Sequence, residues 1–131
     1  MNVPSVKVDI APGDLIDKIT ILSIKSERIE DFEKLKHVKL ELDVLTTIRN
    51  RVLTPSEPLN NLTMKLKEVN ERLWVLEDDI RSCEAVKDFG PHFIELARSV
   101  YQSNDERARL KREINNLLGA RIIEEKSYKP Y

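Results

Sequence analysis

The feature that most constrains the fold of this chain is a seven-residue apolar repeat over residues 59–83. Its apolar positions step by 3, 4, 3, 4, 3, 4 and 3, and they are Leu59, Leu62, Leu66, Val69, Leu73, Leu76, Ile80 and Cys83. An unbroken heptad repeat is typical of a long helix that packs along an apolar seam. We therefore expect a mainly helical protein organised around this helix.

A second stripe follows the same spacing one residue further along, and most of it is polar. Its members are Asn70, Trp74, Glu77, Arg81 and Glu84. The helix therefore offers an apolar edge for packing and, beside it, a charged edge with a single tryptophan. What that charged edge does is the central functional question.

Composition narrows the class of protein. The chain has 131 residues, with 40% apolar and 34% charged residues and only three glycines, which fits a single helical domain over residues 1–131. A formal net charge of −1 argues against a nucleic-acid-binding surface. One cysteine excludes an internal disulfide. No apolar run reaches the roughly 20 residues of a membrane span, and no signal-peptide pattern is present. We expect a cytoplasmic protein without membrane contact.

The first half of the chain predicts one strand and two helices. Residues 5–10 alternate apolar and polar side chains, as a short strand does. Asp14 is a suitable N-cap for a helix over residues 15–29. A kink or short break near Asp31 separates this helix from a second one that reaches residue 53. Because the connection through Pro55 and Pro58 is short, we expect the second and third helices to form an antiparallel hairpin, with Ser56 as the N-cap of the third.

The second half predicts two shorter helices and a tail. The third helix ends near Gly90 and Pro91, a fourth covers residues 92–102, and residues 103–105 separate it from a fifth over residues 106–118. The tail from residue 121 either pairs with residues 6–10 as a two-stranded β-ribbon or stays unpaired. The expected fold is an antiparallel helical bundle built on a long αα-hairpin.

Charged and aromatic side chains on the third to fifth helices form the candidate ligand-binding site. They are Trp74, Glu77, Asp78, Arg81, Arg98, Tyr101 and Asp105. If the fourth and fifth helices are nearly collinear, two stripes face each other, and their arginines offer the paired donors that a phosphate or carboxylate needs. The alternative is that acids and arginines bond one another and fix the register of helix packing.

The sequence gives little support for a metal site or a cofactor site, and we expect neither a metal ion nor a cofactor. Glu68 and Glu71 give only a shortened version of the acidic pattern that binds magnesium in helical nucleotide pyrophosphatases, and Arg98 stands where a further acid is needed. No glycine-rich phosphate loop is present. The basic cluster Arg107, Arg109, Lys111 and Arg112 is flanked by acids, which predicts a solvated face.

Three stretches together resemble a family of small bacterial and phage proteins of unknown function. They are PGDLIDKITIL at residues 12–22, FIELARSVY with NDERA at residues 93–108, and EEKSY at residues 124–128. The resemblance covers most of the chain and implies no activity. It draws attention to polar positions that a packing motif does not require, namely Asp17, Lys18, Arg98, Tyr101, Asn104 and Asp105.

Two functional hypotheses follow. The first is a non-enzymatic interaction module that forms homo-oligomers or binds a protein partner, because a 25-residue apolar seam exceeds what one short helix covers. The second is a small enzyme or binder of an anionic metabolite at the charged cluster. The two differ in whether the charged groups satisfy one another or converge on an open pocket.

Overall fold

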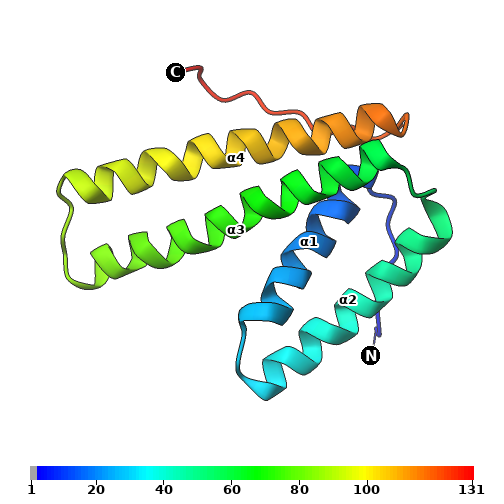
Figure 1. Ribbon diagram of the computed structural model, residues 1–131, viewed down its shortest axis with the longest axis horizontal. Coiled ribbons are helices and arrows are strands. Elements are labelled where there is room, and N and C mark those ends of the chain that lie inside the picture. The colour runs from blue at the N-terminus through cyan, green and yellow to red at the C-terminus, as the bar shows by residue number, and fades with distance from the viewer. Residues whose placement is uncertain (1–2) are drawn as a thin grey trace.

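The computed structural model describes residues 3–131 and contains four helices within them: α1 (Pro12–Arg28), α2 (Phe32–Val52), α3 (Glu57–Ala85) and α4 (Pro91–Leu117). They form two hairpins, α1 with α2 and α3 with α4 (Figure 1). Helix α1 also packs on both α3 and α4, whereas α2 packs on α1 alone. The helical-bundle prediction is confirmed. None of these helices is both long and apolar enough to cross a membrane.

The predicted pairing of the second and third helices is wrong, because α2 lies against α1 and α3 lies against α4. The backbone explains the difference. Leu53 and Ser56 both have extended conformations, at φ −106°, ψ 130° and φ −150°, ψ 157°. An extended connection directs α3 away from α2, as Figure 1 shows, so the long hairpin of the fold is α3–α4.

The predicted fourth and fifth helices are one continuous helix, α4. Residues 103–105 do not interrupt it, and Ser103 is buried. Serine, asparagine and aspartate cost a helix interior only about 0.5 kcal/mol each relative to alanine. Packing against α3 outweighs that cost, since no glycine or proline is present to break the helix.

One of the two predicted N-caps is confirmed. The Ser56 hydroxyl accepts from the Leu59 amide at 3.2 Å. Asp31, at the predicted break, caps α2 by accepting from the Lys34 amide at 2.9 Å. The other predicted N-cap, Asp14, is wrong, because α1 begins earlier, at Pro12, and Asp14 lies within its first turn. Proline is favoured in that first turn, where its missing N–H has no helical partner to lose.

Neither end of the chain forms a strand within the described residues. The expected strand at residues 5–10 does not form, and its valines are exposed. The tail from residue 120 runs back along α4 (Figure 1), held by side-chain contacts. A lone two-stranded ribbon is marginal without a helix face to cover it.

The hydrophobic core lies where α1 crosses the α3–α4 hairpin. Its fully buried members include Ile16 of α1, Leu66 and Val69 of α3, and Leu110 and Ile114 of α4. We call this crossed part of the hairpin, residues 59–70 and 107–117, the proximal end. The heptad seam predicted from the sequence supplies the α3 side of this core.

We call residues 72–106, which include the loop between the two helices, the distal half. The polar contacts between α1 and the hairpin involve Lys67, Asn70, Arg107, Lys111 and Asn115, all outside the distal half. Figure 1 shows the distal half projecting past α1 and α2. Along it, no third helix packs on α3 or α4.

Candidate functional site

The predicted site residues of α3 lie on the distal half and are mostly exposed. Trp74 is half-buried, and Asp78 is exposed. Glu77 and Arg81 bond each other, with 3.2 Å between the Oε2 and Nε atoms. This is an ion pair within one helix, four residues apart, and such exposed pairs contribute little to stability.

The predicted site residues of α4 face the C-terminal tail. Asp105 accepts a hydrogen bond from the Tyr131 hydroxyl at 2.6 Å, and the Tyr101 ring packs edge-on against the Tyr131 ring with 4.9 Å between centroids. Arg98 is exposed. The α3 and α4 groups therefore have separate partners, and the two arginines are not joined in one set of contacts.

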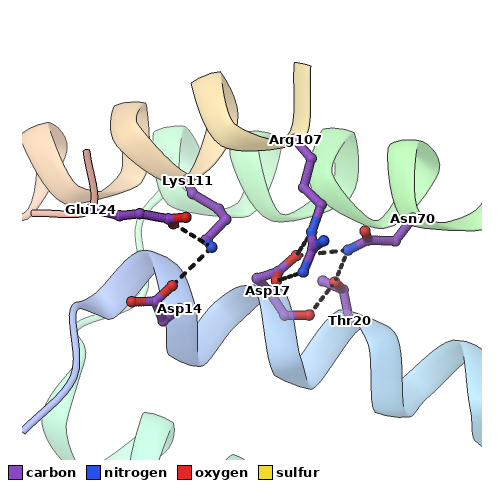
Figure 2. Close-up of polar contacts among 7 residues, drawn as sticks. All are labelled: Asp14, Asp17, Thr20, Asn70, Arg107, Lys111 and Glu124. Atoms are coloured by element: carbon purple, nitrogen blue, oxygen red, sulfur yellow. Dashed lines mark hydrogen bonds and ion pairs between the residues drawn. The ribbon is translucent and has the colours of Figure 1, made fainter. Parts of the chain in front are cut away.

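The most buried polar cluster of the described residues lies instead at the proximal end, around Asp17 of α1 (Figure 2). The Asp17 side chain accepts two hydrogen bonds from Arg107 of α4, with Nε to Oδ1 at 3.0 Å and Nη2 to Oδ2 at 2.6 Å. Asn70 of α3 donates to Asp17 Oδ1 and to the Thr20 hydroxyl, each at 2.9 Å. We call these four residues the Asp17 cluster.

The carboxylate of the Asp17 cluster is almost completely shielded from water. Asp17 is 4% exposed. A bidentate arginine–carboxylate pair is among the strongest hydrogen-bonded contacts in proteins. The bond to Asp17 raises the pKa of the Arg107 guanidinium, and this outweighs the effect of its partial burial. The Arg107 guanidinium therefore keeps its positive charge beside Asp17.

A second paired cation, Lys111 of α4, lies one helical turn further along. Its Nζ is 2.9 Å from Asp14 of α1 and 2.6 Å from Glu124 of the tail (Figure 2). Burial lowers the pKa of Lys111, but the hydrogen bonds to Glu124 and Asp14 outweigh it and leave the pKa raised. The hydrogen bond from Lys111 lowers the pKa of Glu124. Lys111 thus ties α1 and the tail to α4.

The start of α1 approaches α4 so closely that only glycine fits there. The Gly13 amide donates to the side-chain Oδ1 of Asn115 at 2.7 Å. A Cβ at position 13 would lie 2.5 Å from the backbone oxygen of Lys111. This glycine therefore sets the distance at which the Asp17 and Lys111 contacts form.

The buried polar atoms of these clusters already have hydrogen-bond partners within the protein. Every fully buried side-chain nitrogen or oxygen in the described residues has a hydrogen-bond partner. No group of three or more histidine, cysteine or acidic side chains is placed to hold a metal ion within residues 3–131. An arrangement of this kind fixes the register of three helices, which is the structural alternative considered for charged stripes.

Sequence reasoning missed both clusters. Arg107 and Lys111 were predicted to lie on a solvated face, and that prediction is wrong, because both are partly buried and ion-paired. A signal was available in α1, where Asp17 lies on the apolar face with Ile16 and Ile19. A carboxylate among apolar neighbours implies a buried cationic partner. The sequence does not say which of the basic residues it is.

Comparisons with known proteins complete the description. Neither the curated proteins nor the solved structures include a significant match to this chain. The model of a family of unknown function, DUF6165, matches residues 6–131. That match covers nearly all of the chain, and the protein therefore belongs to the DUF6165 family.

Proposed function

We propose that this protein is a non-enzymatic helical interaction module that associates with further copies of itself. The observation that carries the proposal is the incomplete burial of the distal half. Leu76 and Ile80 continue the heptad seam but stay half-buried, whereas Leu66 on the same seam is 0% exposed. A seam that two helices cover incompletely is completed when another helix packs on it.

Charge indicates which surface of a second copy fits the distal half. Residues 72–106 contain eight acidic and four basic side chains, so two distal halves would repel each other. The helix α2 contains five basic and three acidic side chains. It also exposes apolar side chains, with Leu40 at 66% and Val44 at 50%. An apolar, basic α2 complements an apolar, acidic distal half.

The proposed association is therefore head-to-tail, with α2 of one copy on the distal half of the next. Interfaces of this type join different surfaces of the two subunits, and they generate rings when the rotation closes. The Asp17 cluster and the Lys111 contacts lie outside this interface. Because their polar groups bond one another, they are consistent with a packing role. Exposed charges at the rim imply that association weakens as salt is added.

A complementation experiment tests this proposal. Val44→Glu places an acid on α2, and Ile94→Lys places a base on the distal half, where Ile94 is 55% exposed. Sedimentation velocity should show the wild type associating with concentration and each variant alone as a monomer. An equimolar mixture should recover a dimer, because the first variant keeps its distal half and the second keeps its α2.

The control is Asn61→Glu, an exposed position of α3 outside both surfaces, which should associate as the wild type does. A wild type that stays monomeric at every concentration would refute self-association. Variants that abolish association without recovery in the mixture would point to an interface between identical surfaces and refute the head-to-tail arrangement.

A further inference from the structure

A pocket of about 170 Å³ lies where the end of α2 meets the beginning of α3, next to α1. Its apolar wall includes Ile16, Leu53 and Leu59, and Ile16 and Leu59 are buried members of the core. Its polar lining includes Arg49, Asn50 and Asn60. The pocket is separate from the Asp17 cluster, from the predicted site residues and from the exposed apolar side chains of α2.

The charge of this pocket is unbalanced. Arg49 is half-buried, and its guanidinium donates only to the Asn50 side-chain oxygen, with Nε at 3.3 Å and Nη2 at 3.2 Å. That acceptor is neutral, and no carboxylate lines the pocket. The other partly buried cations described above, Arg107 and Lys111, both contact carboxylates. Within residues 3–131, Arg49 thus lines a pocket without a counter-ion.

The donors available favour a monoanion over a phosphate. A guanidinium matches the two oxygens of a carboxylate in a planar, paired contact. The beginning of a helix often binds phosphate through free amides, but here the amides of Leu59 and Asn60 already donate to Ser56. Among the residues that line the pocket at that helix end, Pro55 has no amide hydrogen and the other two amides are used, so the one guanidinium balances a single negative charge.

Size limits the rest of the ligand. A protein cavity of about 150 Å³ with apolar walls holds a benzene molecule, which has six heavy atoms. A pocket of about 170 Å³ therefore accommodates a carboxylate with a short alkyl chain. We propose that this pocket binds a small monocarboxylate, with Arg49 holding the carboxylate and Ile16, Leu53 and Leu59 contacting the apolar chain. This function is independent of self-association.

The test is a nuclear magnetic resonance titration of the full chain with sodium butyrate, which has the expected size. Butyrate should cause saturable shifts in the amide signals of residues around Leu53 and Asn60. The uncharged isostere butyramide should not, because it lacks the charge that Arg49 balances. Inorganic phosphate should bind more weakly than butyrate.

Two variants and one matched control identify the residue responsible. Arg49→Gln should weaken butyrate binding by roughly tenfold or more, the loss expected for one charge-assisted contact. Asn60→Asp should weaken it similarly, because it supplies a carboxylate inside the pocket. Arg51→Gln removes an exposed arginine of the same helix that does not line the pocket, and it should leave binding unchanged.

The proposal is overturned if butyrate causes no saturable shift in the wild-type protein. It is equally overturned if Arg49→Gln, with an otherwise native spectrum, binds butyrate as the wild type does. Phosphate saturating the same amide signals at lower concentration than butyrate would overturn the assignment of a carboxylate ligand.

Discussion

The two ends of the α3–α4 hairpin have the same secondary structure and the same heptad seam, yet they are stabilised differently. At the proximal end α1 packs across the seam, and Leu66, Val69, Leu110 and Ile114 are fully buried. In the distal half no third helix covers the seam, and Leu76 and Ile80 are only half-buried. The heptad pattern thus specifies which side chains meet, and the crossing of α1 adds to their burial, most completely at Leu66 and Val69.

The ion pairs of the two ends also differ in how deeply they are buried. The Asp17 carboxylate is buried and receives hydrogen bonds from α3 and α4. Glu77 and Arg81 of the distal half are exposed and bond only within α3. Removing one partner of a buried pair leaves an uncompensated charge, whereas removing one partner of an exposed pair returns the other to water.

The largest expected effect comes from breaking the Asp17 cluster. Asp17→Ala should lower the free energy of unfolding by about 3 kcal/mol, because it leaves Arg107 partly buried without a counter-ion and Asn70 without an acceptor. The matched change in the distal half, Glu77→Ala, should cost less than about 0.5 kcal/mol. Urea denaturation of both variants measures the difference. Equal losses would mean that the two ends are equally important for stability.

A second pair of variants compares the seam itself. Leu66→Ala should cost about 2–5 kcal/mol, as expected for a fully buried leucine. Leu76→Ala should cost about 1 kcal/mol in dilute solution, because its side chain already contacts water. Under the self-association proposal the cost of Leu76→Ala should grow with protein concentration. Thermal unfolding at low and high concentration measures this, and an unchanged difference would count against a second copy covering Leu76.

The smallest expected effect is the release of the tail in acid. The pKa of Glu124 lies below its ordinary value of 4.5 because its carboxylate accepts from Lys111. The stabilisation from this contact is therefore complete above pH 4.5 and is lost as the pH falls through the lowered pKa. Amide signals of residues 121–131 should shift to those of a free tail in that range, while the helices persist.

Glu124→Gln is the control for the tail. It should weaken the contact with Lys111 at neutral pH and remove most of the pH dependence of the tail signals. If the tail of this variant still detaches over the same acidic range, another group holds it, and the Glu124–Lys111 pair is not responsible.

Local sequence patterns were sufficient for the helices and several of their boundaries. The seam of residues 59–83, the cap Ser56 and the burial of Cys83 follow from spacing and from side chains that bond their own backbone. These features depend on neighbours within a few residues, so the sequence contains them directly. The prediction that residues 103–105 break a helix failed because packing on α3 outweighs weak local preferences.

The sequence by itself determined that this chain forms long amphipathic helices with a continuous seam, because periodicity fixes which face of each helix is apolar. Only the tertiary structure decided which helices pair and which charges are buried. The contact between Asp17 and Arg107 spans 90 residues and exists because α1 crosses the hairpin at that point. The pocket at Arg49 likewise arises from where α2 ends relative to α3. Such positions depend on the relative orientation of whole helices, which no local spacing records.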